Sequence, residues 1–353
     1  MTTVSSKPLA SFTRTAGRSR SAGVDWRNPV GGQASTSDCT KRGTVWVWAR
    51  PAVAAATLAV VVWRLGFGPF LDGVRAVDGA ALAAGAGIGV VTTVWCAWRW
   101  TIVARGLGLP LSFPAAVAAY YRSVFLNLTL PGGVAGDVHR GVSHGRDVRD
   151  YGLALRAVAW ERTAGQIVQA VVTVAVLLAL PSPARPSVPV VLLALLAAVI
   201  IVVLLGRARP GDGRSRWARV RRAITSDVRA ALLARRAWPA IALASVVVVV
   251  GHAITFVIAA RTAGATAPLS QLFPLALLAM LAMVLPSVAG WGLREGATAW
   301  AFAAAGLGAE LGVATAVVYG VMVLVASLPG ALLLVTAWVP RTAVAQTDGA
   351  ADA

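Results

Sequence analysis

The chain has 353 residues, of which 58% are hydrophobic and only 13% are charged. Soluble domains carry about a quarter charged residues, so this composition excludes a soluble cytosolic enzyme, a disordered chain and a disulfide-rich scaffold. The net charge is nevertheless +18, from 32 basic and 14 acidic residues. The two cysteines, Cys39 and Cys96, lie in a polar tail and an apolar run, so we expect no disulfide framework and no metal site.

Long apolar runs dominate the chain between two polar tails. Residues 1–43 are rich in Ser, Thr, Arg and Gly without an apolar core, which predicts a disordered basic tail rather than a signal peptide. A second polar tail, 341–353, follows the transmembrane domain expected at 44–340. About 20 apolar residues cross a bilayer once, so the chain is expected to be an all-α polytopic membrane protein. Six runs are long enough to span: 45–67, 80–103, 151–180, 188–205, 238–260 and 311–339.

The positions of the basic residues predict the orientation of these spans, because Lys and Arg concentrate on the cytoplasmic side of the plasma membrane. Residues 1–50 hold eight Lys or Arg, and the linker 207–236 holds ten arginines. Both termini and the linker are therefore expected in the cytoplasm, which requires an even number of crossings. Six spans fit if the shorter segments 113–130 and 269–307 re-enter from the cytoplasm and from the outside, respectively. Eight spans fit if both segments cross.

Short motifs recur in the same order, 154 to 158 residues apart. They pair Ala104-Arg105-x-x-Gly108 with Ala260-Arg261-x-x-Gly264, Pro110-Leu111-Ser112 with Pro268-Leu269-Ser270, Leu130-Pro131 with Leu285-Pro286, and Val134-Ala135-Gly136-x-x-x-Arg140 with Val288-Ala289-Gly290-x-x-x-Arg294. The halves, about 80–180 and 238–340, would face opposite sides of the membrane. This predicts an inverted-topology repeat with helix breaks at Pro131 and Pro286, as in alternating-access transporters, whose broken helices mark the substrate site. The alternative is that the breaks only turn two hairpins at the interface.

The same motifs resemble a known family. Its pattern is matched by Asn127-x-x-Leu130-Pro131, Gly136-Asp137-x-x-Arg140 and Glu161-Arg162 in the first half, and by Leu285-Pro286 and Gly290-x-Gly292-x-Arg294-Glu295 in the second. The chain is similar to the lysylphosphatidylglycerol synthase transmembrane-region family over about 45–340. The resemblance implies a flippase-like integral membrane protein. Bifunctional members also carry a soluble aminoacyl-transferase domain, and because only 341–353 follow the last run, we expect no lysine transfer to lipid here.

Arginines at membrane depth are functional candidates, because an unpaired charge there is costly. Arg140 and Arg294 occupy equivalent repeat positions, each after a glycine, Gly136 or Gly290, that lets backbone N–H groups approach a ligand. A guanidinium beside a helix N-terminus suits phosphate. We therefore expect Arg140 to hold a lipid phosphate in the inward-open state and Arg294 in the outward-open state. The alternative is that both snorkel to the interface.

Further polar side chains fall within the apolar segments. Glu161 is expected to pair with Arg140 or Arg156, or to titrate as a coupling carboxylate, with Arg162 pointing to a different helix face. Asp137 is expected to hold Arg140, and Glu295 adjoins Arg294.

Several other polar groups have less specific expected roles. His252 is expected to donate to a neighbouring helix or to relay protons, and Asn127 to line a polar path. His139 and His144 are expected to be solvated, and Trp95, Trp98, Arg99 and Trp100 to form an interfacial cluster.

The function expected from these features is translocation of an anionic or polyprenyl-phosphate-linked lipid across the plasma membrane by alternating access. Partners would be that lipid and enzymes that make lipid-linked sugars or aminoacyl lipids, and not nucleic acid, because the linker lacks a recognisable binding fold. No enzyme motif and no cofactor site are found. Two alternatives stay open: a polyprenyl-phosphate-dependent glycosyltransferase using Asp72 and Asp78, and a non-transporting scaffold.

Overall fold

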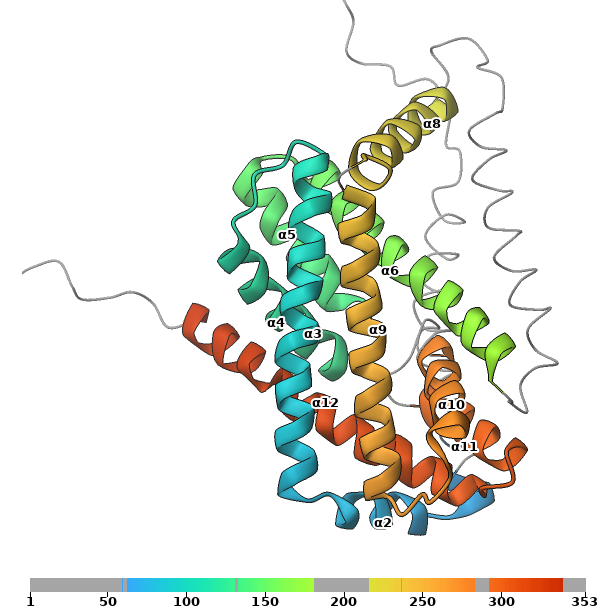
Figure 1. The fold of residues 1–353 in the computed structure, drawn as a ribbon. Helices are drawn as coiled ribbons and strands as arrows, with labels where there is room; N and C mark the ends of the chain where they lie inside the picture. The colour runs from blue at the N-terminus through green and yellow to red at the C-terminus, as the bar shows by residue number, and fades with distance from the viewer. Residues whose placement is uncertain are drawn as a thin grey trace, which may run out of the picture. The chain divides into compact units, whose positions relative to one another are not determined.

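A computed structural model describes residue 59 and residues 62–130, 133–180, 216–235, 237–282 and 292–338. Within these residues all regular secondary structure is helical (Figure 1). In chain order the helices are α2 (Gly68–Ala76), α3 (Gly79–Gly106), α4 (Phe113–Thr129), α5 (Ala135–Val148), α6 (Tyr151–Ala179), α8 (Arg216–Asp227), the π-helical turn η2 (Val228–Leu232), α9 (Ala237–Thr262), α10 (Leu269–Ala282), α11 (Leu293–Ala304) and α12 (Ala309–Trp338). The all-helical class expected from composition is confirmed.

Four of the described helices are long and apolar enough to cross a membrane: α3, α6, α9 and α12. They have 28, 29, 26 and 30 residues, against the roughly 20 that one crossing needs. Their bounds lie within three residues of the runs expected at 80–103, 151–180, 238–260 and 311–339. The expected span 188–205 lies outside the described residues, as does most of 45–67.

The recurring Ala-Arg-x-x-Gly motif is the C-terminal end of a long helix in both places where it occurs. At the end of α3, the backbone N–H of Gly108 donates to the Arg105 carbonyl oxygen at 2.9 Å, and the next backbone N–H donates to the Ala104 carbonyl oxygen at 2.9 Å. At the end of α9, the backbone N–H of Gly264 donates to the Arg261 carbonyl oxygen at 3.0 Å, and the next backbone N–H donates to the Ala260 carbonyl oxygen at 2.8 Å. Both glycines have positive φ, +80° and +98°, which glycine adopts without steric cost. Both ends are therefore Schellman caps.

Each of these caps leads into a pair of shorter helices. After α3, helices α4 and α5 pack on each other, with α5 also against α6 and α4 also against α3 and α12. After α9, α10 packs against α9 and α11, and α11 packs against α12. Figure 1 shows the α4–α5 pair beside the C-terminal half of α3 and the α10–α11 pair beside the C-terminal half of α9. The turn residues Pro131, Pro286 and Gly290 lie outside the described residues.

The end of the arginine-rich linker is anchored on α6 and α3. Asp227, which is buried, accepts hydrogen bonds from Arg156 Nε at 2.9 Å and from Trp160 Nε1 at 3.1 Å, both on α6. Glycine at position 106 allows close packing against η2, because a Cβ there would lie 2.7 Å from Ala231 Cα. Arg156 is therefore engaged by the linker, and the alternative expectation that it pairs with Glu161 is wrong.

Candidate functional site

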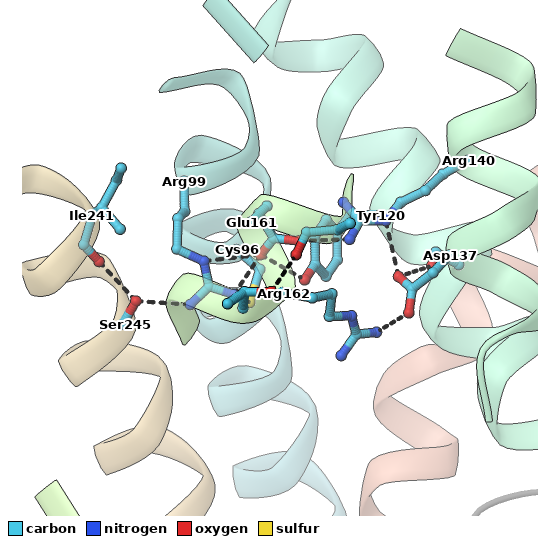
Figure 2. A network of polar contacts seen from close by, with 12 residues as sticks. Cys96, Arg99, Tyr120, Asp137, Arg140, Glu161, Arg162, Ile241 and Ser245 are labelled. Carbon is cyan, nitrogen blue, oxygen red and sulfur yellow. Dashed lines mark hydrogen bonds and ion pairs between the residues drawn. The ribbon is translucent and has the colours of Figure 1, made fainter. Parts of the chain in front are cut away.

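Five charged side chains form a chain of alternating sign across three helices (Figure 2). Arg99 on α3 contacts Glu161 on α6, which contacts Arg140 on α5. Arg140 also contacts Asp137 on its own helix, and Asp137 contacts Arg162, back on α6. Buried charges are stable only when they are paired and hydrogen-bonded, and this arrangement gives each of the two buried carboxylates two guanidinium partners.

Glu161 is the central carboxylate of this network and is fully buried, with 0% of its surface exposed. Its Oε1 accepts hydrogen bonds from Arg99 Nε at 2.9 Å, from Arg99 Nη2 and from the Tyr120 hydroxyl at 3.3 Å. Its Oε2 accepts from Arg140 Nη2 at 2.6 Å. The expected pairing of Glu161 with Arg140 is confirmed, and the carboxylate also joins α6 to α3.

Arg140 is held on several sides. Its Nε donates to Asp137 Oδ1 at 3.0 Å, as expected from the sequence. The guanidinium carbon lies 4.8 Å from the ring centre of Trp100 and 4.5 Å from that of Tyr120, which are cation–π distances. Arg140 has no exposed surface and Arg294 only 2%, so neither snorkels to an interface.

Asn127, near the end of α4, binds Gly136 and Asp137 at the start of α5 and so holds the two helices together. Asn127 Oδ1 accepts from the backbone N–H of Gly136 at 2.8 Å, and Asn127 Nδ2 donates to Asp137 Oδ2 at 3.3 Å. The Ser123 hydroxyl donates to Asp137 Oδ1 at 3.2 Å. A Cβ on Gly136 would lie 1.9 Å from the Ser123 carbonyl oxygen, so the helices meet at a distance that only glycine allows.

Arg99 and Trp100 are buried, which corrects their expected place in an interfacial cluster. Arg99 is 5% exposed and Trp100 is fully enclosed. Besides Glu161, Arg99 donates through Nη1 to the Ser245 hydroxyl on α9 at 2.9 Å. Glycine at position 165 makes room for the guanidinium, since a Cβ there would lie 2.8 Å from Arg99 Nη1.

Trp100 also contacts His144, a residue that was expected to be in solvent. Its ring is edge-on to that of His144, with centroids 5.6 Å apart, and His144 is buried rather than solvated. His139 is exposed, as expected.

A second polar cluster lies on α11, α12 and α9. Arg294 pairs with its neighbour Glu295, and Glu295 Oε2 accepts from the Gly292 N–H at 2.6 Å at the start of α11. The Arg294 guanidinium lies 5.6 Å from the ring centre of Tyr319. The Tyr319 hydroxyl is 3.1 Å from His252 Nδ1, so His252 on α9 contacts α12.

A cavity of about 390 Å³ lies between the two clusters. Residues from α3, α4, α6, α9, α10, α11 and α12 line it, including three arginines, Arg99, Arg162 and Arg294. Arg140 and Glu161 are not among its lining residues. The Arg162 side chain is 40% exposed, although it pairs with Asp137 at 2.7 Å. The cavity therefore presents guanidinium groups, with their paired carboxylates behind them.

The structure brings most of the expected site residues into these two clusters. Asn127, Gly136, Asp137, Arg140, Glu161 and Arg162 form the first, and His252, Arg294 and Glu295 belong to the second. Tyr120 and Ser245 were not expected at the site, and Arg99 was expected at the membrane interface instead. The available signal for Arg99 was an arginine inside an apolar 28-residue helix, whose other arginine, Arg105, lies in the last turn.

Two carboxylates considered for an enzymatic role lie elsewhere. Asp72 is exposed on α2, and Asp78 accepts a hydrogen bond from the Ala81 N–H at 2.7 Å, which makes it the N-terminal cap of α3. Neither lines the cavity. Within the part of the chain that the structure describes, no group of three His, Cys, Asp or Glu side chains is placed to hold a metal ion.

Comparison with known proteins identifies a family for most of the chain. The family model described as the lysylphosphatidylglycerol synthase TM region matches residues 47–330. This range covers both polar clusters and every described helix except the end of α12. No curated protein matches the chain.

Proposed function

Because the chain belongs to the lysylphosphatidylglycerol synthase TM-region family, an integral membrane family related to lipids, we propose that it translocates a lipid. The cargo would be an anionic or polyprenyl-phosphate-linked lipid, moved across the cytoplasmic membrane by alternating access. We propose a transport protein rather than an enzyme, with both termini and the arginine-rich linker in the cytoplasm. The observation that carries this proposal is the arginine-lined cavity among helices long enough to cross the membrane.

The cavity supports lipid transport because its charges suit a phosphate headgroup. Arg99 and Arg162 line it from the first half of the chain, and Arg294 lines it from the second. Guanidinium groups bind phosphate through paired, charge-assisted hydrogen bonds. Such groups at membrane depth mark substrate pathways in membrane proteins.

Alternating access is supported by the placement of the two short-helix pairs. Each follows a long helix that ends in the same type of glycine cap, and each lies beside the C-terminal half of its long helix. In our proposal α4–α5 re-enters from the cytoplasm and α10–α11 from the outside. The pairs would then be the inverted elements whose movements open the cavity first to one side and then to the other.

Two arginines have different relations to the proposed phosphate site. Arg294 lines the cavity and could contact the headgroup as the helices stand. Arg140 binds Glu161 and Asp137 instead, so phosphate binding by Arg140 requires the headgroup to compete with these carboxylates. In our proposal Arg99 and Arg162 receive the phosphate first on that side of the cavity.

The test is lipid translocation by the full-length protein in liposomes, followed as protection of fluorescent lipids from a membrane-impermeant quencher. Arg162→Gln and Arg294→Gln should each slow translocation of an anionic lipid at least tenfold. Arg105→Gln, an exposed arginine at the end of α3, is the matched control and should keep the wild-type rate. Wild-type rates in both cavity variants would refute the proposal.

Further variants test phosphate recognition and distinguish transport from the glycosyltransferase and scaffold alternatives. Arg140→Lys and Arg294→Lys keep the charge but lose bidentate geometry, and wild-type rates in both would argue against phosphate recognition by these two positions. Loss of sugar transfer in membranes on changing Asp72 and Asp78 together to Asn would favour the glycosyltransferase. Silence of all cavity arginine variants in cells would favour a scaffold.

A further inference from the structure

The cavity has an uneven polar lining. Three arginines line it, yet none of its described lining residues is an aspartate or a glutamate. Residues 131–132 and 283–291, which lie outside the described residues, include no aspartate or glutamate either. A cationic group that entered the cavity would therefore find no carboxylate already facing it.

The carboxylates nearest the cavity are occupied by arginine. Glu161 binds Arg99 and Arg140, Asp137 binds Arg140 and Arg162, and Glu295 binds Arg294. Separating a buried carboxylate from its guanidinium leaves an uncompensated charge, which is strongly unfavourable. An ammonium group on a ligand would have to cause such a separation, and it would also meet three guanidinium groups of its own sign.

The charge of the two clusters matches a phosphodiester. The four arginines at positions 99, 140, 162 and 294 outnumber the carboxylates of Asp137, Glu161 and Glu295 by one. A phosphodiester carries one negative charge, so its entry would make the clusters neutral. A second charge on the headgroup, of either sign, would leave the low-dielectric site charged again.

Neutral hydrogen-bonding groups complete the lining. Gln166 and Gln169 both face the cavity from α6, and Gln169 is 8% exposed. Gln166 Oε1 and Gln169 Nε2 have no hydrogen-bond partner among the described residues. An amide oxygen accepts a hydrogen bond and an amide NH₂ donates one, so together they satisfy a hydroxyl group, which does both. A buried polar atom without a partner is unfavourable, and a hydroxylated ligand would remove that cost.

We propose that the cavity selects a lipid whose headgroup is a phosphodiester carrying uncharged hydroxyl groups, such as a glycerol or a sugar, over an aminoacylated headgroup. The arginines bind the phosphodiester, and Gln166 and Gln169 bind the hydroxyls. Phosphatidylglycerol, phosphatidylinositol and polyprenyl-phosphate sugars share this chemistry. The inference rests on the proposed function for its choice of a lipid, but it concerns binding and can be tested without transport.

Equilibrium binding of lipids to the full-length protein in detergent micelles tests the selectivity. The probes are phosphatidylglycerol, phosphatidylinositol, a polyprenyl-phosphate hexose, lysyl-phosphatidylglycerol and phosphatidylmethanol, a phosphodiester without hydroxyls. We expect at least one of the first three to bind at least tenfold more tightly than either of the last two, and the tightest of them identifies the lipid source. Binding of lysyl-phosphatidylglycerol as tight as that of phosphatidylglycerol and the other hydroxylated probes would overturn the inference.

Two cavity variants assign the contacts. Gln169→Leu should remove the preference for the hydroxylated probe over phosphatidylmethanol, while Arg162→Gln should weaken both at least tenfold and keep their ratio. Gln271→Leu is the matched glutamine control, because Gln271 lies on α10 away from the cavity and donates to the Ala305 carbonyl at 3.1 Å. Thermal unfolding of each variant confirms that it is folded.

The outcomes distinguish this inference from the proposed function. A Gln169→Leu protein that unfolds like the wild type and keeps the full hydroxyl preference would overturn the assignment of that contact. Selective binding without translocation would refute transport and leave the inference standing. Translocation that favours lysyl-phosphatidylglycerol would refute the inference and leave transport standing.

Discussion

Replacing Glu161 with glutamine removes the charge at the centre of the five-residue network and keeps the size of the side chain. Glu161 accepts four hydrogen bonds, three of them at Oε1, from Arg99 and Tyr120. A glutamine offers one acceptor oxygen, and its NH₂ group would face a guanidinium that is itself only a donor. Arg99 would keep Ser245 and Arg140 would keep Asp137, so neither arginine would lose every partner.

The size of the effect follows from burial. Removing one partner of a buried ion pair costs about 3–5 kcal/mol, and Glu161 has no exposed surface to lessen that penalty. At roughly 2–4 °C per kcal/mol, the range for domains of about 150–250 residues, Glu161→Gln should lower the unfolding midpoint of this longer chain by several degrees. The double variant Arg99→Gln with Glu161→Gln should lose less than the sum of the two single variants, by about 1–3 kcal/mol.

Differential scanning fluorimetry of the full-length protein in one detergent measures these midpoints. Glu310→Gln is the control, because Glu310 is an exposed glutamate in the first turn of α12. That change should lower the free energy of unfolding by no more than about 0.3–1 kcal/mol, the helix-dipole contribution. Its midpoint should therefore fall far less than that of Glu161→Gln. If Glu161→Gln unfolds at the same temperature as Glu310→Gln, the view that this carboxylate compensates two buried arginines is wrong.

Two further variants test the packing of the helices. Gly136→Ala should lower stability by about 1–3 kcal/mol or more, because its Cβ would overlap the Ser123 carbonyl oxygen. Gly87→Ala is the control and should raise stability by about 0.5–1 kcal/mol, because position 87 in α3 has open space around it. Equal unfolding midpoints of the two variants would contradict the close approach of α4 and α5. Asp227→Asn weakens the contact between the linker and Trp160, so it should speed amide hydrogen exchange in η2. Exchange in the C-terminal half of α9 should stay unchanged. Unaltered exchange in η2 would show that other contacts hold this turn.

The long helices and half of the site were accessible from the sequence. Apolar runs of bilayer length predicted α3, α6, α9 and α12, because hydrophobic length is a local property of the chain. The charged residues of the first cluster, Asp137, Arg140, Glu161 and Arg162, stood out for the same reason, as ionisable groups near apolar segments. The ordered repeat added Arg294.

What the sequence could not provide was the choice of partners between distant helices. Arg99 lies between two tryptophans, and that local pattern is typical of a membrane interface. Its burial depends on Glu161, 62 residues away, and on Ser245, 146 residues away. These contacts arise only when α3, α6 and α9 pack together, so no local pattern in the sequence around Arg99 indicates them.

The positions of the ion pairs give the two short-helix pairs unequal stiffness. Moving α5 away from α6 would separate Arg140 from Glu161 and Arg162 from Asp137. On the other side, the Arg294–Glu295 pair lies within α11, and a displacement of α11 from α12 would leave that pair intact. Ion pairs therefore oppose the separation of α5 from α6, whereas the Arg294–Glu295 pair does not oppose the separation of α11 from α12. In the two halves with matching motifs, the buried ion pairs thus hold different parts together: two neighbouring helices in the first half and a single helix in the second.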